Sequence, residues 1–132
     1  MTEETKNIFM EAQKGELDAV IMYNMLADAM ESENREIAEN LRKIAKDEGK
    51  HAAIFKKLTG EAVVPDDAQA KYVCGLLHAV GAKTLFANIA KGEYDSIEKF
   101  NGLQDEYPEL REIVEDEPKH GDALIKMSEI TG

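Results

Sequence analysis

An internal repeat is the feature of this sequence that most constrains its fold. Residues 14–18, KGELD, return as residues 91–95, KGEYD, and residues 44–51, IAKDEGKH, return as residues 113–120, IVEDEPKH. The two blocks recur in the same order, which indicates one structural unit present twice. Glu48 follows Glu16 by 32 residues, whereas Glu117 follows Glu93 by 24, so the second copy has arms about one helical turn shorter.

The repeated unit is predicted to be a helix hairpin. Helix formers dominate, only three prolines interrupt the 132 residues, and β-branched residues form no strand-like runs. The caps and breakers predict helices over residues 2–31, 34–58, 83–104 and 108–130, with a short connecting helix from residue 66 or 67 to residue 80. The prediction is all-α: a four-helix bundle of two antiparallel hairpins joined by a long crossover, in a single domain of residues 1–132.

Polar residues interrupt each apolar stripe near its middle. At alternating spacings of three and four, the stripes read Phe9, Ala12, Glu16, Ala19, Tyr23, Leu26, Met30; Ile37, Leu41, Ile44, Glu48, His51, Phe55, Leu58; Phe86, Ile89, Glu93, Ile97, Phe100, Leu103; and Leu110, Ile113, Glu117, His120, Leu124, Met127. The pattern therefore predicts four carboxylates and two imidazoles at one level of the core.

Four buried carboxylates need compensation, because a lone buried charge is very costly. Shared protons could neutralise some of them, whereas two divalent cations neutralise all four. Residues three apart on a helix are about 60° apart around the axis and about 4.5 Å apart along it, so each Glu-x-x-His pair can reach one ion. One Glu from each of two helices and Glu-x-x-His from the other two is the ligand pattern of di-iron carboxylate bundles.

The same residues carry a resemblance to a known family. Glu16, Ala19 and Tyr23, followed by Asp47, Glu48 and His51, resemble the ferritin-like domain of rubrerythrins, and the shorter second half resembles the rubrerythrin-type domains of vacuolar-iron-transporter-like proteins. The resemblance implies a ferritin-like fold and a non-haem site with two Fe ions. It assigns the metal ligands to Glu16, Glu48, His51, Glu93, Glu117 and His120, with Tyr23 beside the site as a catalytic residue.

The donor set leaves the metal open. Carboxylates and imidazoles suit iron or manganese, so Mn or a mixed Fe/Mn pair is possible, and Zn is possible in the protein as purified. We expect Glu48 and Glu117 to bridge the two ions and Glu16 and Glu93 to be terminal ligands. Asp47 and Asp116 are interpreted either as solvated surface or as acceptors for the histidine N–H groups.

Three departures from the rubrerythrin pattern affect the expected chemistry. The chain has one cysteine, Cys74, and no CxxC pair, so electrons are expected from an external donor such as a rubredoxin. Ser96 stands where rubrerythrins carry a further Glu, three residues after the third-helix ligand. Pro118 follows Glu117 inside a predicted helix, where it leaves the Val114 carbonyl without its helical donor and is expected to kink or bulge the helix.

The resemblance implies an oxidoreductase that reduces peroxide or dioxygen while oxidising Fe²⁺, as a peroxidase or a ferroxidase. The alternatives are an iron-binding or iron-delivery domain without sustained turnover, and a purely structural di-metal bundle.

Composition restricts the partners. The net charge of −11 disfavours nucleic acid, and the N-terminus lacks a secretory signal, so a cytoplasmic location without membrane insertion is expected. Residues 72–90 form the one low-charge stretch. Val73, Leu76, Leu77, Val80 and Leu85 cannot all face one core, so we expect a homodimer or a higher homo-oligomer built partly on this segment, with His78 and Lys83 at its rim. The alternative is that this face binds a transporter.

Overall fold

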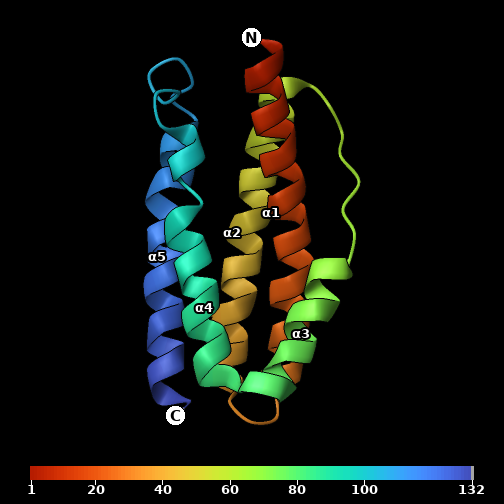
Figure 1. Cartoon of the computed structure of the whole chain (residues 1–132), viewed down its shortest axis with the longest axis vertical. Coiled ribbons are helices and arrows are strands. Elements are labelled where there is room, and N and C mark those ends of the chain that lie inside the picture. Colours follow the sequence, from red (N-terminus) through yellow and green to blue (C-terminus); the bar gives the residue numbers. More distant parts are fainter. Residues whose placement is uncertain (132) are drawn as a thin grey trace. The chain divides into compact units, whose positions relative to one another are not determined.

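The computed structural model describes residues 1–131, and within them every regular element is helical. The elements are α1 (Glu3–Met30), α2 (Arg35–Thr59), α3 (Ala68–Val80), α4 (Ala82–Asp95), the short 3₁₀ helix η1 (Glu98–Phe100) and α5 (Leu110–Ile130) (Figure 1). The predicted all-α class, with two long helix pairs and a connecting helix, is confirmed.

The chain divides into two compact units, residues 1–74 and the residues from 75 onward. In the first unit α1 packs along α2, and in the second α4 packs along α5. The connecting helix α3 spans the division. Each copy of the sequence repeat therefore corresponds to one helix hairpin, while the single domain of residues 1–132 stays a prediction.

Local side-chain chemistry defines the helix ends of the first unit. The Thr2 hydroxyl accepts a hydrogen bond from the Thr5 N–H, and the Asn34 side chain accepts one from the Ile37 N–H, so both helices have N-caps. Gly60 ends α2 with a φ of 74°, a conformation that glycine adopts without strain. The predicted boundaries of the first hairpin are thus correct to within one residue.

The prediction of a helix over residues 83–104 is wrong at its C-terminal end, because α4 stops at Asp95. The Ser96 hydroxyl donates to the Glu93 carbonyl at 2.7 Å, and the Ser96 N–H donates to the Gly92 and Glu93 carbonyls. This closes the last turn of the helix. A 3₁₀ turn follows, and Gly102 has a φ of 82°. Phe100 is nevertheless buried. Its spacing in the apolar stripe matched a continuing helix, so the periodicity predicted a helix that extends too far.

The connection that follows α2 is tied to α1 near both of its ends, and we call residues 60–67 the strap (Figure 1). Its contacts are Lys6 Nζ to Glu61 Oε1 at 3.2 Å, Gln13 Nε2 to the Glu61 carbonyl at 3.2 Å, Lys14 Nζ to Asp66 Oδ2 at 2.8 Å, and the Asp66 N–H to Asp18 Oδ1 at 2.9 Å. Asp66, one of the two aspartates at which the connecting helix was predicted to begin, also accepts the Ala68 N–H at the start of α3. The strap is therefore an ordered part of the first unit.

Most of the predicted stripe residues are buried. The half-buried exceptions are Glu16, Ala19, Leu58, Ile89, Ile97 and Leu103. In the low-charge stretch Leu85 is buried core, whereas Tyr72 and Val80 are 69% and 46% exposed. None of the helices within residues 1–131 combines the length and the apolar character needed to cross a membrane.

Candidate metal centre

Three predicted ligands of the first unit converge in the structure, and we call Glu16, Glu48 and His51 the first cluster. His51 Nδ1 lies 3.5 Å from Glu16 Oε2 and 3.4 Å from Glu48 Oε1. The His51 side chain is 0% exposed, that of Glu48 4% and that of Glu16 11%. Two acidic side chains and one imidazole therefore lie close together in a largely buried environment.

The packing of α1 on α2 places the first cluster. The rings of Phe9 and Phe55 are 5.8 Å apart, which fixes the register of the two antiparallel helices about two turns from Glu16. At this register Glu16 is level with the turn that contains Glu48 and His51. Because the cluster lies in the interior of both helices, its backbone is held by complete helical hydrogen bonding.

The second unit repeats the arrangement with Glu93, Glu117 and His120, which we call the second cluster. His120 Nδ1 lies 3.8 Å from both Glu93 Oε2 and Glu117 Oε1. All three side chains are at most 6% exposed. In both clusters the same ring nitrogen, Nδ1, faces one carboxylate from its own helix and one from the neighbouring helix.

Ser96 is part of the second cluster's surroundings. Its hydroxyl lies 3.3 Å from Glu117 Oε2, in addition to its 2.7 Å bond to the Glu93 carbonyl. A hydroxyl has one proton, so the shorter bond to the carbonyl is the stronger of the two. The sequence identified Ser96 as a departure from the family pattern, but only the structure shows its contact with a predicted ligand.

The donor atoms of each cluster fit a divalent cation. Within each cluster, one donor atom from every residue lies within 4.8 Å of the others. Metal–ligand bonds of about 2.1 Å separate adjacent donors by about 3 Å, so an ion would need only small side-chain movements. Two carboxylates and one imidazole suit Fe, Mn or Zn better than Cu(I), which prefers sulfur ligands. Each unit thus brings together three candidate ligands that could hold one ion.

The other residues singled out from the sequence are placed as follows. Tyr23 is 1% exposed and lies two turns beyond Glu16 on α1. Asp47 and Asp116, which precede the ligand glutamates, are half-buried. Pro118 lies inside α5, which runs as one helix from Leu110 to Ile130. The catalytic role of Tyr23 and the part played by the two aspartates stay predictions.

Comparison with protein families identifies the chain. The family model described as Rubrerythrin matches residues 7–128, nearly the whole sequence and all six predicted ligands. The chain belongs to the rubrerythrin family. This membership confirms the ferritin-like fold class. No curated protein and no solved structure matched the chain.

Rubrerythrins bind two iron ions, so family membership and the donor sets agree on the kind of site. The sequence prediction named all six residues of the two clusters, and each cluster forms within its own unit. The prediction did not foresee the contact of Ser96 with Glu117, and it gave no role to Gln13, which lies one turn before Glu16 on α1. Gln13 is 2% exposed, a degree of burial that its position beside the apolar stripe did not indicate.

Proposed function

We propose that this protein is a non-haem di-iron oxidoreductase that oxidises Fe²⁺ with peroxide or dioxygen. The supporting observation is the pair of matching clusters, each with one glutamate and one Glu-x-x-His motif, in a chain of the rubrerythrin family. Together they offer four carboxylates and two imidazoles, enough to hold two iron ions. Bound iron would supply two electrons per site by cycling between the ferrous and ferric states.

The protein's own residues would hold and insulate the metal. Glu16 and Glu48 in the first cluster, and Glu93 and Glu117 in the second, would balance the charge of the cations, and His51 and His120 would add neutral ligands. Burial lowers the local dielectric constant and strengthens the attraction between carboxylates and cations. Tyr23, which is buried on α1, is proposed to act beside the site.

A second candidate is an iron-binding or iron-delivery domain without sustained turnover. Ser96 favours it, because a hydroxyl replaces the further carboxylate found at this position in rubrerythrins, and its proton is engaged with a backbone carbonyl. Under both proposals we expect the protein in the cytoplasm, with reducing equivalents supplied by a separate protein such as a rubredoxin.

One experiment distinguishes these functions. The anaerobic ferrous protein is mixed with hydrogen peroxide or with dioxygen, and ferric absorbance is followed by stopped flow. Fast stoichiometric oxidation by peroxide, followed by repeated cycles with reduced rubredoxin, is expected for a peroxidase. Faster oxidation by dioxygen indicates a ferroxidase, and a single oxidation without further cycles indicates iron delivery. The Zn-loaded protein is the control, and an absence of oxidation by both oxidants would contradict the proposal.

We also propose a homodimer that uses the exposed apolar side chains of α3. Tyr72 and Val80 are exposed and Leu77 is half-buried, which leaves apolar area on an acidic surface. Light scattering of Leu77→Glu tests this: a folded monomer is expected. An unchanged oligomer would place the interface elsewhere, and an unfolded protein would assign Leu77 to the core of the protomer.

A further inference from the structure

A pocket of about 260 Å³ lies in the first unit, beneath the strap. Its walls come from three segments: Gln13 and Leu17 on α1; Gly49, Ala52, Ala53 and Lys56 on α2; and Ala62 and Val63 on the strap. For comparison, an engineered apolar cavity of about 150 Å³ binds benzene. The pocket is thus large enough for a ring that carries small substituents.

Gln13 gives this pocket an unsatisfied polar group. Its Nε2 donates to the Glu61 carbonyl at 3.2 Å, and because a carbonyl only accepts, this bond fixes the orientation of the amide. Within residues 1–131, the Gln13 Oε1 atom is buried and accepts no hydrogen bond. A buried acceptor left without a donor costs about 1–3 kcal/mol, so a ligand that donates to Oε1 would gain from the contact.

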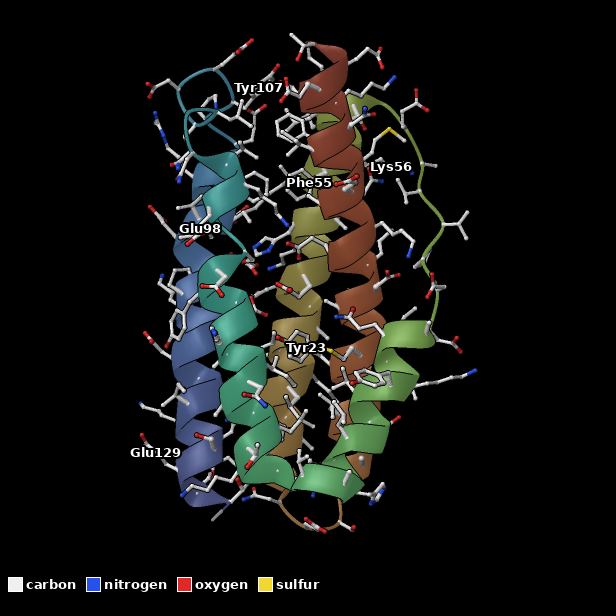
Figure 2. The ribbon with its side chains drawn as sticks, viewed as in Figure 1. Tyr23, Phe55, Lys56, Glu98, Tyr107 and Glu129 are labelled. Carbon is white, nitrogen blue, oxygen red and sulfur yellow. The ribbon has the colours of Figure 1, made fainter. Side chains whose placement is uncertain are left out.

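The rest of the pocket is apolar except at Lys56. Leu17, Ala52 and Val63 provide aliphatic walls, whereas Lys56 is exposed and makes no ion pair within the described residues. In Figure 2, Lys56 is labelled on the side of α1 where the strap runs, and Phe55 is labelled on the other side of α1. The pocket therefore combines a buried acceptor, apolar walls and a free cation.

The ligand group that donates to Gln13 Oε1 is expected to be a hydroxyl, because burying a charged ammonium group would cost more free energy. The ammonium of Lys56 attracts an acidic group at the other end of the molecule. The register of α1 and α2 places Ala52 level with Gln13, and Lys56 lies one helical turn further along α2. Lys56 is therefore about one turn from the level of Gln13. Its flexible side chain can follow ligands of different lengths.

We propose that this pocket binds a small carboxylic acid with an apolar body and a hydroxyl group. The hydroxyl donates to Gln13 Oε1, the apolar body lies between Leu17, Ala52 and Val63, and the carboxylate pairs with Lys56. None of the six predicted metal ligands lines the pocket. Binding there does not depend on the proposed di-iron function.

The test is a titration of the full chain, loaded with Zn, followed by ¹H–¹⁵N NMR. The probe is 4-hydroxybenzoate, and the matched ligands are benzoate, which lacks the hydroxyl, and phenol, which lacks the acid. Saturable shifts are expected at the Gln13 side-chain amide and at Gly49 and Ala52. For a ligand of this size we expect a Kd of about 1 mM. Benzoate and phenol are each expected to bind about three- to ten-fold more weakly.

Two variants assign the contacts. Gln13→Met removes the acceptor at similar volume, so 4-hydroxybenzoate should lose its advantage over benzoate. The readout is the ratio of the affinities for 4-hydroxybenzoate and benzoate rather than either affinity alone, because Gln13→Met also removes the bond to Glu61. Lys56→Met should remove the advantage of 4-hydroxybenzoate over phenol, while the control Lys57→Met, at an exposed neighbour outside the pocket, should keep it.

The outcomes separate this proposal from the proposed function. Glu117→Ala, which removes a predicted metal ligand of the second unit, should bind 4-hydroxybenzoate as the parent does. Three results would overturn the pocket proposal: no saturable shifts at the lining residues, equal affinities of the parent for benzoate and 4-hydroxybenzoate, or an unchanged ratio in Gln13→Met. The first would mean that water alone satisfies Gln13.

Discussion

The two hairpins carry the same candidate metal-ligand side chains, but the helices around these side chains differ in length. In the first unit, both α1 and α2 continue for two turns or more on either side of the cluster. In the second unit, α4 ends at Asp95, two residues after Glu93. The distances from histidine Nδ1 to carboxylate oxygen are 3.4–3.5 Å in the first cluster and 3.8 Å in the second.

The residues that follow the ligands differ as well. Three residues after Glu16 stands Ala19, whereas three residues after Glu93 stands Ser96, whose hydroxyl contacts Glu117. Gly49 follows Glu48, but Pro118 follows Glu117. The comparison teaches that a repeat can preserve its chemistry while its local stabilisation changes, and we expect the two clusters to respond differently to equivalent substitutions.

The largest effect is expected when a carboxylate of either cluster is removed. We expect Glu48→Ala and Glu117→Ala each to lower bound metal from two ions per chain to at most one and to abolish iron oxidation. The helices should remain, because the apolar stripes supply most of their stability. Metal analysis and circular dichroism measure both effects.

The control for these variants is Glu115→Ala, at an exposed position of α5 that should leave metal content unchanged. If the melting temperature of Glu48→Ala still rises with Fe²⁺ as that of the parent does, Glu48 is not a ligand.

The next effect concerns the second cluster alone. Ser96→Ala removes the hydroxyl contacts to Glu117 and to the Glu93 carbonyl, so we expect about ten-fold weaker binding of one of the two metal ions. Competition with a chelator measures the two affinities separately.

Ser128→Ala is a matched control in the same unit, because within residues 1–131 the buried Ser128 hydroxyl bonds only to the Ile125 carbonyl. Equal losses in both variants would show that Ser96 acts through general stability rather than through Glu117.

A third comparison uses the glycines beside the clusters. A Cβ at Gly49 would lie 3.8 Å from Val20, an ordinary contact, so Gly49→Ala should stabilise by about 0.5–1 kcal/mol through helix propensity. A Cβ at Gly121 would lie 2.6 Å from the Tyr94 ring, which hydrogen-bonds to Asp122. Gly121→Ala should therefore destabilise by about 1 kcal/mol as the ring is displaced.

Urea unfolding of both alanine variants tests this difference in sign. In Tyr94→Ala, which removes the ring, the same change at Gly121 should no longer destabilise. A stabilising Gly121→Ala in the parent would mean that the Tyr94 ring moves aside without loss.

The smallest effect concerns the strap. The hydrogen bond from Lys14 lowers the pKa of Asp66, with a further contribution from the Ala68 N–H. A carboxyl with a lowered pKa in the folded state stabilises above its unfolded value of about 3.9, and this stabilisation is lost as the pH falls through the folded pKa. We expect the strap to loosen only in acid. Carboxyl ¹³C NMR should show that Lys14→Met raises the pKa of Asp66, whereas Lys46→Met, a control on α2, leaves it unchanged.

Much of this architecture could be read from the sequence because single residues encode it. Thr2 and Gly60 mark helix ends through their own side-chain or backbone chemistry, and the interrupted stripes contain all six members of the two clusters. The end of α4 could not be predicted, because Ser96 closes the helix through a bond that competes with a continuing apolar pattern. The pocket was also hidden, since it depends on where the strap settles against α1.

The early end of α4 has an electrostatic consequence. The carbonyls of a last helical turn carry a partial negative charge, and here Glu93 and Asp95 add two acidic groups to a turn without a basic residue. The last turn of α2, by contrast, contains Lys56 and Lys57. A cation bound at Glu93 would supply the charge that these lysines supply to α2. Filling the second cluster should therefore slow amide hydrogen exchange at the end of α4, which would make this helix end a reporter of metal occupancy.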